Sequence, residues 1–448
     1  MPKFRAVALL SAVLSFAVAC LWTCDVRAEE RRPLPDYDGR GERPPTTGEV
    51  LLWVPRILLA PPYLVSEYLV RRPLGFVIAG AERAGVPAFL YDFFTFGSEH
   101  QAGIIPTAYV DFDFYPSIGL YAFWDGAGLK GHDLRLRAAT GGSEWLAGSV
   151  AERLRFTRDP ADQIALEASG EHRPDYTFFG LGPESRQSNL VRYGQDTREV
   201  RGLISKRLWR ASFLHAGLAL RRVEFRRGGY GGDPVLEDAI GSGKFPPPPG
   251  YEQGYELLRS SLAAVFDDRL PRPAPGSGIR VAAQASHSGS VRSAGSFVTY
   301  GATVGGFWDL NDRARVLSLS VGARFADPIA GATIPFTELV TLGGQEPMRG
   351  LYPGRLIDRS GAVAALAYRW PVWIWLDGAL RAELGNVFGE HLAGFSWSRL
   401  RWSGSIGVES NGSPDSAFQI AFGLGSETFE SGAKVNSFRL AAGTTHGF

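Results

Sequence analysis

The chain has 448 residues and a formal net charge of +1; 45% of the residues are hydrophobic and 21% are charged. This charge balance excludes a nucleic-acid partner held by bulk positive charge. Gly (55 residues) and aromatic residues (12%) are abundant, whereas no apolar run beyond residue 25 reaches the roughly 18 residues of a membrane-spanning helix. A membrane role for this chain would therefore require β-strands.

Residues 1–28 predict a cleaved secretory signal peptide. A positive start (Lys3 and Arg5) precedes an apolar stretch, and Val26–Ala28 fits the small-x-small cleavage pattern. A single membrane anchor and a lipoprotein signal are the alternatives, but the apolar run is short and the residues before each cysteine fit a lipoprotein site poorly. Both cysteines lie in this segment, so the exported chain needs no disulfide framework.

Residues 29–104 predict a Pro-rich linker followed by a partly helical periplasmic extension or plug. Residues 29–47 are charged and rich in Pro and Gly, which is typical of a flexible linker. The apolar block 50–70 is interrupted by three prolines and cannot form one continuous span. Residues 74–96 have an amphipathic pattern. They predict either a short packed subdomain or an element that lies on the membrane surface or inside a barrel lumen.

From residue 105 to residue 448 the pattern is that of β-strands. Segments rich in Val, Tyr, Phe, Trp and Thr alternate with Gly, Pro, Asn and Asp, and in several segments apolar side chains occupy every second position. A soluble β-sandwich would alternate similarly, but segments of about ten to fourteen residues with aromatic ends are typical of lipid-facing strands. The predicted segments are 107–115, 117–125, 131–140, 145–156, 163–170, 197–209, 212–226, 254–267, 278–289, 295–308, 314–326, 362–374, 376–388, 399–409, 416–425 and 435–448.

These sixteen segments predict an all-β fold, a sixteen-stranded antiparallel transmembrane β-barrel with a short, partly helical N-terminal extension. Lipid tolerates only closed sheets, and an even strand count places both termini on the periplasmic side. The long connections (171–196, 227–253 and 327–361) all follow odd-numbered segments and so share the outward side. We expect a monomer in the cell outer membrane, in contact with outer-membrane lipid.

The last segment carries a separate signal. Phe438, Leu440 and Phe448 lie on one face of an alternating strand, and the chain ends on an aromatic residue. Such an ending is typical of proteins that the bacterial barrel-assembly machinery inserts, and we predict that machinery as a partner.

Residues 334–388 contain a set of spaced motifs. They are a Leu-Gly-Gly run (Leu342, Gly343 and Gly344), an Arg-Gly motif (Met348, Arg349, Gly350 and Leu351), a Tyr-Arg strand (368–371) and an acidic-x-Gly strand (383–385). With these motifs, residues 105–448 resemble the barrel of the bacterial surface antigen family, the superfamily of BamA, TamA and the two-partner-secretion transporters. The spacing from Leu-Gly-Gly to Arg-Gly is the most specific part of the resemblance.

The resemblance implies a role for Arg349. In the family, the loop that carries the motif folds back into the lumen, and its arginine meets acidic residues on the inner wall. We predict Glu383 as the partner of Arg349, because a carboxylate stabilises a guanidinium in a narrow lumen, and Gly350 permits a close backbone approach. The chain departs from the family at Leu351, where an aromatic residue is usual, and at Ala367, where an acid is usual. A solvated loop arginine is the alternative interpretation.

The resemblance also implies insertion, assembly or translocation of proteins, or of lipids, at the outer membrane, with unfolded or exported proteins as clients. The expected mechanism uses a weakly paired seam between the first strand, near Thr107, and the last strand, which ends at Phe448. Protein-handling members usually carry periplasmic POTRA modules. Residues 29–104 have room for one but lack its alternating strands, so we interpret the chain as a member without POTRA domains.

No catalytic or cofactor chemistry is predicted. The seven histidines are scattered without a zinc-binding motif, and no serine lies in a Gly-x-Ser-x-Gly elbow. We therefore expect no enzyme activity, no cofactor and no metal. A passive diffusion channel or transporter built on the same barrel is the alternative function, and a soluble exported binding protein is a third.

Overall fold

The computed structural model describes residues 85–444 except 98, 129, 270–275, 292–294, 312–313, 346, 374–375 and 411–417, together with residues 50, 53–58, 60, 68 and 83. The predicted signal peptide, the linker at 29–47 and Phe448 lie outside the described residues.

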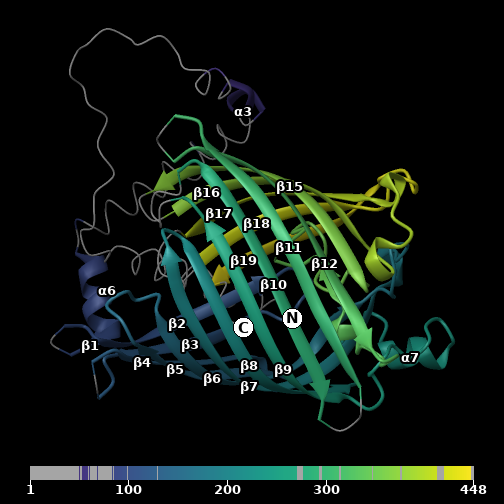
Figure 1. Ribbon diagram of the computed structural model, residues 1–448, viewed down its shortest axis with the longest axis horizontal. Coiled ribbons are helices and arrows are strands. Elements are labelled where there is room, and N and C mark those ends of the chain that lie inside the picture. The colour runs from purple at the N-terminus through teal and green to yellow at the C-terminus, as the bar shows by residue number, and fades with distance from the viewer. Residues whose placement is uncertain are drawn as a thin grey trace.

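Sixteen long strands form one closed antiparallel barrel (Figure 1). Each pairs with its neighbours along the chain, and the last pairs with the first. The predicted fold class is confirmed. The strands are β2 (Ala102–Asp111), β3 (Ser117–Asp125), β4 (His132–Gly142), β5 (Trp145–Arg155), β6 (Gln163–Phe178), β7 (Val191–Trp209), β8 (Ser212–Arg226), β9 (Tyr255–Asp267), β10 (Gly278–Ser290), β11 (Ser296–Asp309), β12 (Val316–Ile329), β15 (Ser360–Trp373), β16 (Leu376–Phe388), β17 (Arg401–Ser410), β18 (Phe418–Ser426) and β19 (Val435–Thr444).

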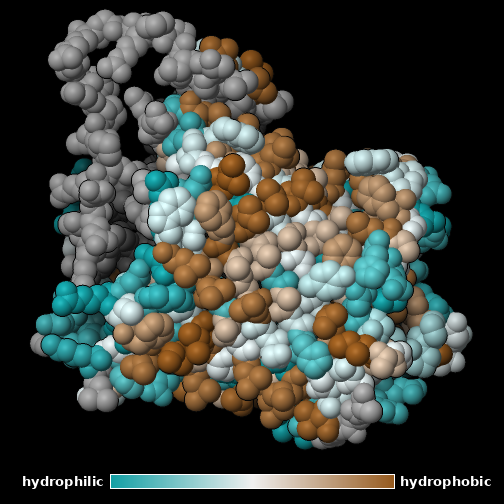
Figure 2. All heavy atoms as spheres, in the orientation of Figure 1, coloured by the Kyte–Doolittle hydropathy of each residue, from teal (hydrophilic) through white to brown (hydrophobic). Residues whose placement is uncertain are grey.

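Strand alternation gives the barrel an apolar outer wall. Phe266, Val281, Val304 and Val321 face one another across four neighbouring strands, and each is between 37% and 57% exposed. Apolar side chains spread over the visible wall, and polar ones gather toward the two ends of the barrel (Figure 2). A continuous exposed apolar band of this kind is stable only in contact with lipid.

The remaining elements are short, and apart from α3, which lies outside the barrel, they lie at the ends of the wall or inside it (Figure 1). They are α3 (Trp53–Leu58), α6 (Val86–Phe94), β1 (Thr95–Phe96), η2 (Gln187–Asn189), α7 (Leu236–Gly241), η3 (Phe336–Glu338), β13 (Val340–Leu342), β14 (Leu356–Asp358), η4 (Glu390–Leu392) and η5 (Trp397–Arg399). Strand β1 pairs with the start of β2, and Phe94 of α6 packs near Ile105 and Tyr121. Within the described part of the chain, every helix is too short or too polar to span a bilayer.

The first strand differs from its predicted bounds. Strand β2 covers Ala102–Asp111 instead of 107–115. Asp113 has φ = 67°, which ends the extended conformation, and Phe114 packs with Phe179 and Tyr352. The aromatic run after residue 111 therefore belongs to the packed outward end of the barrel and not to the lipid-facing wall.

Strands β6 and β7 extend further outward than predicted. They reach Phe178 and begin at Val191, so the connection between them is shorter than 171–196. Tyr193 and Phe178 pack with Phe336 in a buried aromatic cluster. Because both faces of these strand ends are covered, the apolar-polar alternation is lost there.

Candidate functional site

The connection between β12 and β15, residues 330–359, crosses the barrel lumen; we call it the inward loop. On one side, the Glu338 carboxylate accepts a hydrogen bond from the Tyr255 hydroxyl (2.7 Å) and forms ion pairs with Arg259 and Arg221 (3.6 Å to the latter). These three wall residues lie on β8 and β9. The loop tip contacts β16–β19 on another part of the inner wall, so the loop bridges the lumen.

Arg349 lies at this tip and contacts two carboxylates in different ways. Its backbone N–H donates to Glu383 Oε2 (3.1 Å), whereas its guanidinium Nη2 lies 3.6 Å from Glu409 Oε2. Glu409 also forms ion pairs with Arg381 (3.1 Å) and Arg369. The structure therefore brings the Arg349 backbone and Glu383 together, whereas the Arg349 guanidinium forms an ion pair with Glu409.

Glu409 was not predicted from the sequence, because it lies outside the acidic-x-Gly strand at 383–385. A signal was present: Glu409 lies at an odd position of β17, the same parity as Ser403, and this face points into the lumen. Three arginines converge on one carboxylate, each side chain being 27% exposed or less. This arrangement ties the loop tip to β15, β16 and β17 at once.

Gly350 is required by a close approach of two backbones. A Cβ at this position would lie 1.9 Å from the Leu424 carbonyl oxygen of β18. Its N–H donates to Ser403 Oγ (2.9 Å), and its carbonyl accepts from Ser437 Oγ (2.7 Å). The motif glycine therefore lies flat against β18, between hydroxyl groups supplied by β17 and β19.

The other motif residues form the packed turn that holds the tip. Met348 and Leu351 are fully buried with Leu342, and Met348 adopts φ = 67°. Gly343 and Gly344 have φ values of 109° and 94°, a region that favours glycine, and they donate to the carbonyls of Pro347 (3.0 Å) and Leu351 (2.9 Å). The Leu-Gly-Gly run and the Arg-Gly motif are thus two halves of one folded unit.

The inward loop also reaches the contact between the last and first strands, which we call the seam. Arg439 of β19 forms a buried ion pair with Asp111 of β2 (2.5 Å) and donates to the Gly344 carbonyl. Gln345 donates to the Tyr109 hydroxyl (3.2 Å). The described seam has only three residue pairs in register: Tyr109–Gly443, Val110–Ala442 and Asp111–Ala441.

Two residues of the predicted C-terminal signal lie near this seam. Phe438 and Leu440 are 44% and 38% exposed and point outward, on the face that includes Ala442. They belong to the lipid-facing wall and not to the lumen.

A buried charge cluster anchors the loop at the outward end. Arg355 of the inward loop and Arg401 of β17 both pair with Glu427, Arg355 at 2.9 Å. Burial and the neighbouring Arg401 lower the pKa of Arg355 to about 9, which leaves it protonated at neutral pH. Burial opposes ionisation of Glu427, but Arg355 and several hydrogen bonds outweigh it and lower its pKa to about 2.

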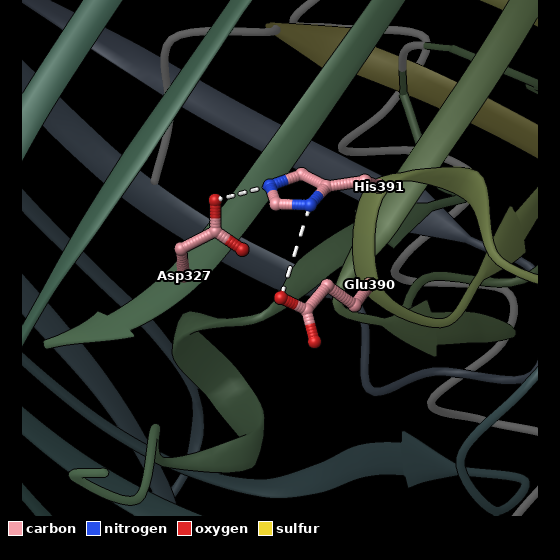
Figure 3. Close-up of side chains that lie close together, drawn as sticks. All are labelled: Asp327, Glu390 and His391. Carbon is pink, nitrogen blue, oxygen red and sulfur yellow. Dashed lines mark hydrogen bonds and ion pairs between the residues drawn. The ribbon is translucent and has the colours of Figure 1, made fainter. Parts of the chain in front are cut away.

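Asp327, Glu390 and His391 converge at the outward end of β12, with ligand atoms within 4.8 Å of one another (Figure 3). His391 Nε2 lies 2.8 Å from Asp327 Oδ2. Arg359 pairs with both carboxylates, at 3.2 Å from Asp327 and 3.0 Å from Glu390. Because this guanidinium already supplies a cation, the residues do not fit a metal centre well. They tie η4 to β12 and to Arg359.

A closed barrel with an apolar wall and an arginine-bearing loop clamped across its lumen defines an outer-membrane β-barrel protein. The model of the Omp85 superfamily domain matches residues 156–445. The chain belongs to the Omp85 superfamily, which confirms the resemblance to BamA-like barrels and indicates the outer membrane as its location.

One solved structure with a TM-score above 0.5 has a similar fold. BamA from Haemophilus ducreyi lacking POTRA domains 1–3 is similar, with a TM-score of 0.53 and 14% identity over 77% of this chain and 70% of that chain. CdiB from Acinetobacter baumannii gives a TM-score of 0.45 and 10% identity over 76% of this chain and 60% of that chain. No curated protein matches the sequence. At these identities the likeness concerns the fold alone.

Proposed function

We propose that this protein inserts or translocates polypeptides at the outer membrane by opening its seam, without enzymatic chemistry. The observation that carries the proposal is the short pairing of β19 with β2. Among the described residues these strands share three pairs in register, whereas β18 and β19 share nine. Counted over the described residues, lateral opening at this contact separates fewer register pairs than opening between β18 and β19.

The backbone at the seam supports this mechanism. Gly443 has φ = 137°, and a Cβ there would lie 2.2 Å from the Ala108 carbonyl oxygen. The backbones of β19 and β2 therefore approach each other at Gly443 too closely for a residue with a side chain. The buried Asp111–Arg439 ion pair holds the strands together, and Arg439 also bonds to the inward loop at Gly344. Movement of the loop is thereby coupled to the seam.

The inward loop disfavours the alternative of a passive diffusion channel. It is fixed to β8 and β9 through Glu338 and to β16–β19 through Arg349 and Gly350. A loop held on two parts of the wall obstructs the path of a small solute. We therefore expect little steady conductance in a planar bilayer while the loop stays clamped.

A disulfide across the seam tests the proposal. Val110 and Ala442 are paired in register, so V110C/A442C can form a bridge in a chain whose Cys20 and Cys24 are replaced by Ser. The matched control, L366C/A382C, links a register pair of β15 and β16. The first assay measures how fast a urea-denatured eight-stranded barrel protein folds into liposomes that contain each variant. A parallel assay measures transfer of a denatured soluble polypeptide into the lumen of the same liposomes.

The oxidised seam variant should lose most of its acceleration of folding or transfer, and reductant should restore it, whereas the control should act like the parent. Equal activity of both oxidised variants would show that the seam stays closed during function. Steady solute-sized conductance that is unaffected by either bridge would favour the channel instead.

A further inference from the structure

The outer wall carries a groove across β2–β7, with a volume of about 870 Å³. One row of residues, paired from strand to strand, forms its floor. The row is Leu120, Ala138, Gly148, Gly170 and Arg198. Its three middle positions carry a methyl group or no side chain, and the wall is hollow there. The row covers four inter-strand steps, or roughly 19 Å at about 4.8 Å each.

The groove faces lipid. Ile118 and Leu146 line it and are 51% and 50% exposed. They lie on the same side of the sheet as Val150 and Val200, which belong to the exposed apolar wall. The inner side of the same strands carries buried residues such as Tyr121 and Trp145. An elongated apolar groove on this surface has the length and polarity of a site for an acyl chain.

One end of the groove presents an unpaired cation. Among the described residues, exposed Arg198 forms no hydrogen bond or ion pair. Its neighbour Arg222, opposite it on β8, is already paired with Glu224. Asp196 also lines the groove, but its carboxylate is bonded to His172 Nδ1 (2.6 Å) and to Arg226 Nε (3.1 Å). The guanidinium of Arg198 is therefore the charge available to a ligand.

Arg198 lies where the apolar band ends. On β7 the outward-pointing side chains after it are apolar at Val200 and Ile204, and Trp209 follows 11 residues beyond Arg198. This spacing matches the length of a tilted strand that crosses the hydrocarbon core. An arginine at this boundary reaches the level of lipid phosphates, where an anion stabilises it.

We propose that this groove binds an anionic lipid of the surrounding leaflet, its phosphate on Arg198 and one acyl chain along Ala138, Gly148 and Gly170. The site is distinct from the inward loop and goes beyond the proposed insertion function. Because Pro106 and Thr107 of β2 also line the groove, the bound lipid contacts the strand that forms one side of the seam.

Filling the groove is the first test. A Cβ on Gly148 would lie 3.5 Å from its nearest neighbour, an ordinary contact, so G148L should fold. The control G202L adds the same side chain on the same face of the wall, outside the groove, where a Cβ has open space. Native mass spectrometry of the full chain from mixed phosphatidylglycerol and phosphatidylcholine vesicles should show phosphatidylglycerol retained by the parent and G202L and lost by G148L.

Removing the charge is the second test. R198Q should lower retention of phosphatidylglycerol roughly fivefold, the effect expected for one basic residue at an anionic surface, and leave phosphatidylcholine unchanged. R222Q, which alters a paired arginine at the same depth, should act like the parent. Heat-dependent gel mobility confirms that each variant is folded.

Two results would overturn the proposal. One is phosphatidylglycerol retention by G148L and R198Q equal to the parent. The other is equal loss of both lipids in G148L with no effect of R198Q, which would mark the groove as ordinary annular contact. Cross-linking of the denatured barrel probe at the groove, with lipid retention unchanged in both variants, would assign the groove to a polypeptide and would also contradict the lipid site.

Discussion

The last strand has two neighbours, and its contacts with them differ. Strand β19 pairs with β18 over nine residue pairs and with β2 over three among the described residues. The longer contact is a ladder with one register shift near its end, at Gly425 and Ser426. The shorter contact has its three pairs and a backbone bond from Phe112 N–H to the Leu440 carbonyl (2.9 Å), and it is reinforced by the buried Asp111–Arg439 ion pair and by bonds from the inward loop. Side chains thus reinforce the barrel where the described parts of the first and last strands share few backbone pairs, and these side-chain contacts can be changed one at a time.

The largest effect is expected at the loop tip. G350V would place a side chain into the backbone of β18, where even a Cβ lies 1.9 Å from the Leu424 carbonyl oxygen. The β18 backbone cannot move without breaking its ladder, and the Gly350 backbone is held by Ser403 and Ser437. We therefore expect loss of most folded barrel, measured as the heat-modifiable band on a gel. G202V, at a glycine with open space around it, should fold normally; equal yields of the two variants would refute the tight contact.

The next effect concerns the seam. D111N leaves Arg439 buried without its carboxylate, and loss of one partner of a buried pair costs about 3–5 kcal/mol locally. Amide hydrogen exchange should accelerate in β2 and β19 and stay unchanged in β11 and β12, which share a long ladder. Uniform acceleration over all strands would mean that the seam is no weaker than the rest of the wall.

A smaller effect is expected at Glu409. E409Q leaves Arg349, Arg369 and Arg381 without their shared carboxylate and should cost about 1–3 kcal/mol. E383Q should have less effect, because Glu383 accepts hydrogen bonds from the Arg349 N–H and from Ser403, and an amide oxygen can accept both. Urea titrations of the folded barrel should rank the two variants in this order, and the reverse order would restore Glu383 as the main partner.

The smallest effect is a pH dependence at the outward end. The pKa of Glu427 is lowered from its usual 4.5 to about 2, so its contribution to stability is complete above pH 4.5 and is lost as the pH falls through 2. Pepsin should cut the inward loop faster at about pH 2 than at about pH 4. This increase should exceed the change in pepsin activity between the same two pH values, measured on a denatured substrate. E427Q should abolish this extra change, and a parent-like pH profile in E427Q would exclude Glu427 as its source.

Strand alternation was sufficient to predict the sixteen strands, because a wall between lipid and lumen imposes a two-residue period on every strand. Strand ends were predicted less well where the strand no longer has lipid on one side and the lumen on the other. At the outward ends of β6 and β7, and around Phe114, aromatic packing replaces lipid on the outer side, and the period disappears.

The site was only partly predictable for a related reason. The motif identified Arg349 and Gly350, and the acidic-x-Gly strand identified Glu383, which does contact the motif. Three features join residues of separate segments of the chain. They are the ion pair of Arg349 with Glu409, the Asp111–Arg439 ion pair at the seam, whose residues are 328 positions apart, and the row of small residues next to Arg198. They depend on inter-strand register.

The sequence by itself therefore determined the strand number, the apolar face of each strand and the position of the loop motif, since these follow from local spacing. The tertiary structure decided which carboxylate meets which arginine, which described residues of the first and last strands pair at the seam, and where the wall is hollow. Those features depend on barrel closure and stagger, and a shift of one residue between two strands would turn each side chain to the opposite face.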